Sequence, residues 1–181
     1  MSRLEEALKT RAKTVEDRDQ IARQLSNAVV KSVYLHPGEM YASPEPANLT
    51  IILGSCVAVC IFNPRLSIGG ATHYLLATLE GKPQASPRYG DMAINTLLRE
   101  LRQLGSRNKD LRAHVYGGAR MLQTIRGNAQ ESIGDKNVQL ALRMLSEAAI
   151  PIDKRDTGGR KSRKVTMRTD TGSMSLTLVG N

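Results

Sequence analysis

Three residues with catalytic side chains stand near one another in the sequence. Cys56 follows a Gly54-Ser55 turn at the end of an apolar run, and His73 comes 17 residues later. A thiol attacks only as the thiolate, so it needs a base or a cation beside it, and histidine can serve as base and then as acid. Thr50, six residues before Cys56, is placed to offer its oxygen to the far ring nitrogen of His73. The three residue types predict a cysteine nucleophile with an oriented histidine base.

Two apolar runs must bring the cysteine and the histidine together. Residues 57–62 form the first run, a polar turn follows at residues 63–65, and a diglycine at residues 69–70 leads to His73. If the two runs pair antiparallel across this turn, residues distant in number become cross-strand neighbours. The separation in sequence is therefore no obstacle to contact.

The same residues also have plainer interpretations. A cysteine in an apolar run is most often a small buried hydrophobe, and Cys60 within VAVCIF fits that description. Cys56 fits it less well, because the chain is expected to turn sharply just before it. His73, next to a diglycine, is also compatible with a simple turn histidine. Spacing alone leaves both interpretations open.

Several motifs, in order along the chain, resemble those of the CheD family of chemoreceptor glutamine deamidases. They are HPGEM at 36–40, TIILGSCVAVCIF from 50, IGGATH ending at 73, RYGDMA at 88–93, HVYGGARM at 114–121, IGDKN at 133–137, and DTGG with Arg163 at 156–163. The resemblance covers about residues 33–180. It implies a nucleophilic Cys56, a general base His73 and an orienting Thr50.

The resemblance further implies a layered α/β sandwich and a reaction without a cofactor. The implied substrate is a glutamine side chain on the cytoplasmic helices of a chemoreceptor, hydrolysed through a thioester with release of ammonia. Backbone amides around Ser55 and Cys56 are candidate oxyanion donors, and Gly54 and Gly70 are further candidates for substrate binding. The resemblance also implies that the protein is a partner of the CheC phosphatase. The alternative function is therefore a non-catalytic or dual-role module that binds receptors and a CheC-type phosphatase.

The chain departs from the family pattern at three positions. Ala71 stands where methionine is common, Ala77 stands where proline is common, and Ser162 stands where glycine is common before the arginine. None of these departures removes Cys56, His73 or Thr50, but each bears on the shape of the substrate groove.

The composition of the chain argues against several other classes of protein function. A formal charge of +9 favours acidic partners, but aromatic residues make up 3% of the chain and argue against a base-stacking surface, so we expect no nucleic-acid partner. Cysteines in C-x₃-C spacing with scattered histidines make a poor zinc set, and we expect no metal. We expect a cytoplasmic protein without membrane insertion, because residues 1–31 lack the apolar core of a signal sequence and no apolar run reaches spanning length.

The patterning predicts one domain over residues 32–181 after a charged extension, helical or disordered, over residues 1–31. Apolar spacing predicts helices over 91–104 and 137–149, the second with Asp135 as its N-cap. The Pro-Gly pair at 37–38 predicts a type II turn, and residues 42–48 are expected to form a loop. Short strands and hairpin signals between the helices predict an α/β sandwich of mixed β-sheet with packed helices.

Overall fold

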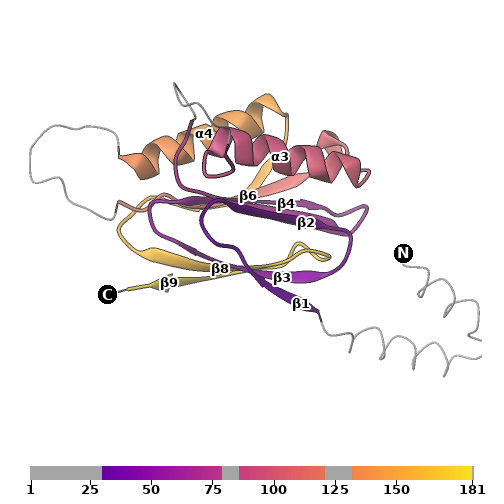
Figure 1. Cartoon of the computed structure of the whole chain (residues 1–181), viewed down its shortest axis with the longest axis horizontal. Coiled ribbons are helices and arrows are strands. Elements are labelled where there is room, and N and C mark those ends of the chain that lie inside the picture. Colours follow the sequence, from indigo (N-terminus) through magenta and orange to yellow (C-terminus); the bar gives the residue numbers. More distant parts are fainter. Residues whose placement is uncertain (1–29, 79–85, 121–131, 181) are drawn as a thin grey trace, which may run out of the picture. The chain divides into compact units, whose positions relative to one another are not determined.

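Two β-sheets and two helices form three layers in the computed structural model, which describes residues 30–78, 86–120 and 132–180 (Figure 1). In spatial order, the four-stranded sheet contains β1 (Lys31–Tyr34), β3 (Ala47–Leu53), β8 (Ser162–Arg168) and β9 (Met174–Val179). The five-stranded sheet contains β2 (Glu39–Ser43), β5 (Ile68–Tyr74), β4 (Val57–Asn63), β6 (Arg112–Gly117) and β7 (Ile152–Thr157). Helices α3 (Gly90–Gln103) and α4 (Ile133–Glu147) cover the outer face of the five-stranded sheet, and a short 3-10 helix, η1 (Asn108–Asp110), precedes β6.

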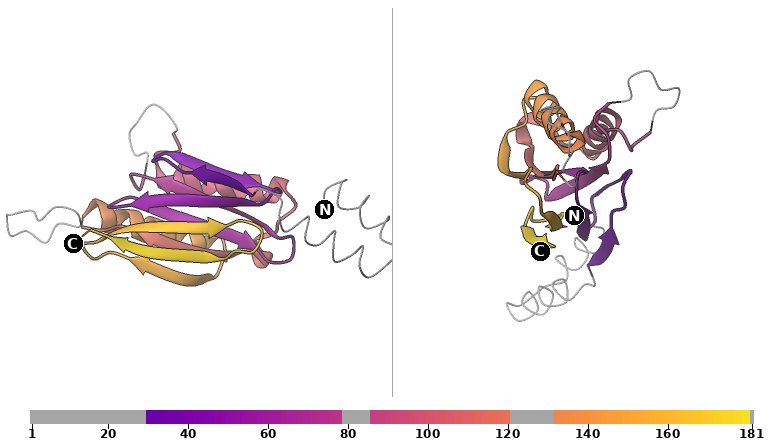
Figure 2. Two further views of the ribbon diagram at one scale, coloured as in Figure 1. Left: turned by 90° about the horizontal axis from the view of Figure 1, so that it is seen from below. Right: turned by 90° about the vertical axis from the view of Figure 1, so that its left-hand side faces the viewer.

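The pairing of the strands is mixed, as the sequence predicted. β1 and β3 are parallel, as are β6 and β7, while the other pairs are antiparallel. Figure 2 shows the same layers from two further directions. The predicted fold class, an α/β sandwich of mixed sheet with packed helices, is confirmed.

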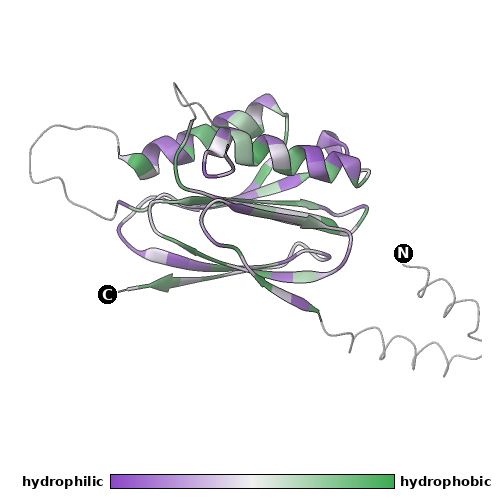
Figure 3. Cartoon of the chain, viewed as in Figure 1, coloured by the Kyte–Doolittle hydropathy of each residue, from purple (hydrophilic) through white to green (hydrophobic). Residues whose placement is uncertain are grey.

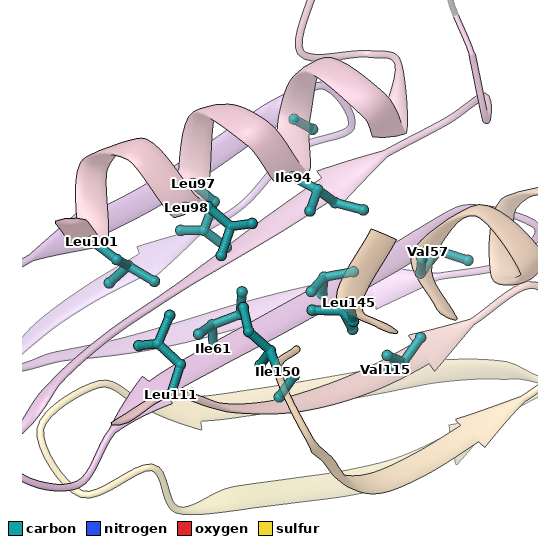
Figure 4. Packing of buried hydrophobic residues seen from close by; sticks show 14 of the residues in the cluster. Val57, Ile61, Ile94, Leu97, Leu98, Leu101, Leu111, Val115, Leu145 and Ile150 are labelled. Carbon is teal, nitrogen blue, oxygen red and sulfur yellow. The ribbon is translucent and has the colours of Figure 1, made fainter. Parts of the chain in front are cut away.

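The inner strands β4 and β5 of the five-stranded sheet are buried on both faces, which explains the continuous apolar runs of the sequence. Alternate residues of β4 contact different layers: Val57, Val59 and Ile61 pack against the helices, as Figure 4 shows for the labelled Val57 and Ile61. Ala58 and Cys60 face the four-stranded sheet instead. Because the side chains of a strand alternate between faces, a strand between two layers has no polar side.

The four-stranded sheet has one face open to solvent. In β3, Leu49, Ile51 and Leu53 are buried in the inter-sheet core, whereas Thr50 is only partly buried and Ile52 is exposed. Figure 3 shows the corresponding mixture of hydrophobic and hydrophilic residues along this sheet and along both helices. The alternation fixes which side chains of β3 can contact the five-stranded sheet.

The first predicted helix is confirmed, and the second begins earlier than predicted. α3 agrees with the predicted span to within a residue at each end. In α4 the N-cap is Ser132, and Asp135 is the third helical residue of a capping box, so its assignment as N-cap was wrong. The Ser-x-x-Asp pattern satisfies the free N–H groups one turn upstream of the apolar run.

The turn prediction at residues 36–39 is confirmed, because Gly38 has φ of 90° and Glu39 N–H donates to the His36 carbonyl at 3.0 Å. The loop expected over residues 42–48 is shorter in the structure. β2 continues to Ser43 and β3 starts at Ala47, so that only the Pro44–Pro46 segment connects them. Both prolines lie in this connection, where no ladder hydrogen bond is required of them.

One compact unit spans Lys31–Asn181. The charged extension predicted over residues 1–31 lies outside the described residues, except for its last two positions, and Lys31 already belongs to β1. Within the described ranges, neither helix is long and apolar enough to cross a membrane.

Candidate active site

The chain passes from one sheet to the other at the turn that carries the cysteine. Gly54, Ser55 and Cys56 connect β3 of the four-stranded sheet to β4 of the five-stranded sheet. Each of their carbonyl groups accepts a hydrogen bond: Gly54 from Ala119 N–H at 2.8 Å, Cys56 from Gly118 N–H at 2.8 Å, and Ser55 from the Asn137 side chain at 3.1 Å. The backbone around the thiol is therefore held in place from outside the turn.

The strand register places His73 on the face of the five-stranded sheet whose cluster Cys56 packs against. His73 lies directly opposite Ala58 in the β4–β5 ladder, and Cys56 precedes Ala58 by two residues. Cys56 itself lies just before β4 and outside this ladder; if the register continued through it, Cys56 would be a diagonal neighbour of His73, at a separation that side chains can span. Cys56 also packs against the inter-sheet cluster that contains Ala58, which supports the same assignment.

His73 is 1% exposed, and its ring is oriented by the backbone. Nδ1 lies 2.9 Å from the carbonyl oxygen of Leu35. Because a carbonyl oxygen can only accept, Nδ1 carries the proton, and in the neutral ring Nε2 holds the lone pair. Among the described residues no atom hydrogen-bonds Nε2. The nitrogen that can act as a base is thus left free inside the protein.

Burial shifts the pKa of both side chains toward their neutral forms. It lowers the pKa of His73 below 6.5, against a smaller opposing effect of the Leu35 carbonyl. Burial raises the pKa of the Cys56 thiol above 9.0. Both shifts favour the neutral forms, so a nucleophilic role for Cys56 would require loss of the thiol proton during attack.

Cys60 is a diagonal neighbour of His73 within the β4–β5 ladder, and it is more deeply buried than Cys56. It is 2% exposed, and burial raises the pKa of its thiol to about 12. Cys56 is only partly buried. The structure thus agrees with the interpretation of Cys60 as a buried apolar side chain.

Thr50 and His73 are connected through the backbone of Leu35. Leu35 N–H donates to the Thr50 carbonyl at 2.9 Å, and the Leu35 carbonyl is the group that faces Nδ1 of His73. The Thr50 side chain lies on the face of β3 opposite to the buried Leu49 and Ile51. The oxygen expected from Thr50 is therefore supplied to the ring by Leu35, which sequence reasoning had not identified.

The glycines proposed for substrate binding have different surroundings. Gly54 belongs to the turn beside Cys56, where its carbonyl is paired with Ala119. Gly70 lies within β5, between Ala42 of β2 and Ile61 of β4. A Cβ at Gly70 would collide with the Tyr41 carbonyl, so this glycine is required for close strand packing.

Asn137 is a site residue that sequence analysis assigned only to a helix. Its Nδ2 group donates to the Ser55 carbonyl at 3.1 Å and to the Leu75 carbonyl at 2.8 Å. It thereby joins Ser55, the residue before Cys56, to the end of the strand that carries His73. Its place in the IGDKN motif was the only feature of the sequence that could have indicated a role at the site.

A buried arginine stabilises the loop next to the cysteine turn. Arg163 is 5% exposed, forms an ion pair with Asp156 at 2.7 Å and donates to the Gly158 carbonyl at 2.8 Å. Gly158 N–H donates in turn to the carbonyl of Gly117. The next residue, Gly118, donates its N–H to the Cys56 carbonyl. The DTGG loop, the second diglycine and the cysteine turn thus form one hydrogen-bonded chain. Among the described residues no cluster of histidine, cysteine and carboxylate side chains is suited to hold a metal ion.

The fold and the site together define a two-sheet α/β protein with a cysteine and a histidine on one inner face. A family model described as CheD chemotactic sensory transduction matches residues 76–177, more than half of the chain. The match begins after His73, so it carries no information on the three predicted catalytic residues.

Curated relatives agree with the family match. A probable chemoreceptor glutamine deamidase CheD of Anaeromyxobacter dehalogenans is 42% identical over 78% of this chain and 81% of its own length. A probable chemoreceptor glutamine deamidase CheD of Trichlorobacter lovleyi is 38% identical over 81% and 90%, and the chemoreceptor glutamine deamidase CheD of Thermotoga maritima is 35% identical over 79% and 89%. The chain belongs to the CheD family.

Proposed function

We propose that this protein is a chemoreceptor glutamine deamidase that acts in chemotaxis. Its target is the side-chain carboxamide of glutamine on the cytoplasmic helices of receptors, and its products are glutamate and ammonia. The observation that carries the proposal is the Nε2 atom of His73, unpaired among the described residues, on the inner sheet face whose cluster Cys56 packs against. The names of the curated relatives support the substrate class.

In the first half of the reaction, Nε2 of His73 takes the Cys56 proton while the sulfur bonds to the carboxamide carbon. The carbonyl π electrons move to oxygen, and the N–H groups of Ser55 and Cys56 are the proposed donors to this oxyanion. When the oxyanion collapses, the C–N bond breaks and ammonia leaves with the proton from His73. A thioester to Cys56 remains.

In the second half, a water molecule gives a proton to Nε2 as its oxygen bonds to the thioester carbon. The C–S bond then breaks, glutamate is released, and the proton returns to the sulfur. Leu35, held by the Thr50 backbone, keeps the proton on Nδ1 throughout, so that Nε2 is the nitrogen that exchanges protons.

The test is conversion of glutamine to glutamate in a purified receptor cytoplasmic fragment, followed by peptide mass spectrometry and by ammonia release. Cys56→Ala, Cys56→Ser and His73→Gln should each lower kcat by at least about 10³-fold. Cys60→Ala is the matched control and should retain activity. Conversion that persists in the Cys56 variants would contradict the proposal.

The alternative function, an interaction module for receptors, is distinguished in the same assay. Receptor binding by the wild-type chain without any glutamine conversion would favour that function. Binding to a CheC-type phosphatase stays a separate prediction, to be tested with a purified phosphatase in a binding titration. The net charge of +9 is consistent with an acidic protein surface as the partner in either case.

A further inference from the structure

The side chain of Asn137 bridges two strand ends at the site. Asn137 lies in the second turn of α4 and is fully buried. Its amide group donates both hydrogens to backbone carbonyls, one to Ser55 and one to Leu75. Tyr74 O–H donates at 2.7 Å to the Asn137 backbone carbonyl, which holds the same helical turn against β5.

Among the described residues no group hydrogen-bonds the Oδ1 atom of Asn137. A buried polar atom without a partner costs about 1–3 kcal/mol, and an apolar side chain of similar size would avoid that cost. We therefore expect the two N–H donors of Asn137 to have a role beyond packing. One of them bonds the carbonyl of Ser55, the residue before the proposed nucleophile Cys56.

The carbonyl of Ser55 shares a peptide unit with the N–H of Cys56. In a trans peptide the two groups point in opposite directions, so holding the carbonyl toward α4 directs the Cys56 N–H away from the helix. That N–H is one of the proposed oxyanion donors. The orientation of this donor thus depends on the atom that pairs with the Ser55 carbonyl.

The neighbouring carbonyls of the turn are held differently. Gly54 and Cys56 accept from the backbone N–H groups of Ala119 and Gly118, which every substitution except proline retains. The Ser55 carbonyl accepts from a side chain. Ser55–Cys56 is therefore the peptide unit of the turn whose orientation depends on a side chain, so that truncating this side chain can release it.

The approach of α4 to the turn depends on a contact between two glycines. A Cβ on Gly134 would collide with the Gly118 carbonyl, and a Cβ on Gly118 would collide with Val138. Gly118 also has φ of 67°, a conformation that glycine adopts without strain. This close packing brings the first turn of α4 against the loop that bonds Cys56, and it places Asn137 within reach of Ser55.

We propose that Asn137 is a positioning residue that orients the Ser55–Cys56 peptide as an oxyanion donor. Its bond to Leu75 fixes the second amide hydrogen and prevents rotation of the side chain. This role rests on the proposed deamidase activity. It is separate from the role of His73, because Asn137 acts on the peptide unit and not on the imidazole.

The test compares two reactions of the same thiol. Deamidation needs the oxyanion donors, whereas alkylation of Cys56 by iodoacetamide needs the thiol but forms no oxyanion. Asn137→Leu removes the two donors at similar volume, and Asn137→Asp keeps the size while replacing the donors with acceptors. Lys136→Ala, at an exposed position on the same helix, is the matched control. All assays are run below the onset of thermal unfolding of each variant.

For both Asn137 variants we expect kcat for a receptor fragment to fall by about 10²–10³-fold. KM and the alkylation rate of Cys56 should each stay within about threefold of wild type. An unchanged kcat in a folded Asn137 variant overturns the role of Asn137 alone. A parallel loss of alkylation and deamidation also overturns it, because it would show a general disturbance of the thiol. A wild-type chain that converts no glutamine overturns the deamidase activity and this role together.

Discussion

Nδ1 of His73 lies 2.9 Å from the carbonyl oxygen of Leu35, and this contact determines which nitrogen of the ring is free. Leu35 follows β1 of one sheet, while His73 lies in β5 of the other. The hydrogen bond therefore joins the two sheets at the site. It leaves Nε2 as the basic nitrogen on the face that Cys56 shares.

The first prediction concerns pH. His73 must be neutral to accept the thiol proton, and burial lowers its pKa below 6.5, so protonation should inactivate the enzyme only below that value. The raised pKa of Cys56 places the basic limit above 9.0. We expect kcat/KM to be flat between these limits, measured from about pH 5 to about pH 10. An acid limit above 6.5, or alkylation of Cys56 that titrates well below 9.0, would indicate a resting thiolate–imidazolium pair instead.

The second prediction concerns Thr50. Its contact with Leu35 uses the backbone carbonyl, and its side chain lies on the face of β3 opposite to the inter-sheet core. Thr50→Val keeps the backbone and the β-branched shape while removing the hydroxyl. We expect kcat within about threefold of wild type. A loss as large as that of His73→Gln would show that the hydroxyl itself orients the ring.

The third prediction separates the two thiols. Cys60 is fully enclosed with a pKa raised to about 12, so only Cys56 should react in the folded protein. Native alkylation should add one label per chain in the wild type and in Cys60→Ala, and none in Cys56→Ala. Cys60→Ala should lower the free energy of unfolding by about 1 kcal/mol through the lost packing, as measured by urea denaturation. Labelling of Cys60 before unfolding would contradict this assignment.

The fourth prediction concerns the loop beside the site. Arg163→Ala would remove the ion pair to Asp156 and leave the Gly158 and Lys161 carbonyls without their donor. We expect a loss of about 2–3 kcal/mol in the free energy of unfolding, because the arginine is buried although Asp156 is partly exposed. Arg160→Ala, at an exposed position in the same loop, is the control and should change stability by less than about 0.5 kcal/mol. Equal effects of the two substitutions would show that Arg163 does not stabilise the loop.

The sequence was sufficient where the determining interactions are local. A short turn after Asn63 joins two apolar runs, so the pairing of β4 with β5 follows from a single hairpin, and with it the face on which His73 lies. The helix over 91–104 and the turn at 36–39 also depend on short-range patterns, and both were predicted. In the second helix, the apolar run was recognised, but the Ser132 cap one turn earlier was not.

Only the tertiary structure decided which sheet each strand joins and which distant groups meet at the site. The assignment of β3 to the other sheet is a non-local choice, and it turns the Thr50 side chain away from His73 while bringing the Leu35 carbonyl to the ring. Asn137 reaches Ser55 across 82 residues of sequence, through the packing of α4 on the second diglycine. Periodicity and turn signals describe short segments, whereas these contacts depend on how layers from distant parts of the chain pack together.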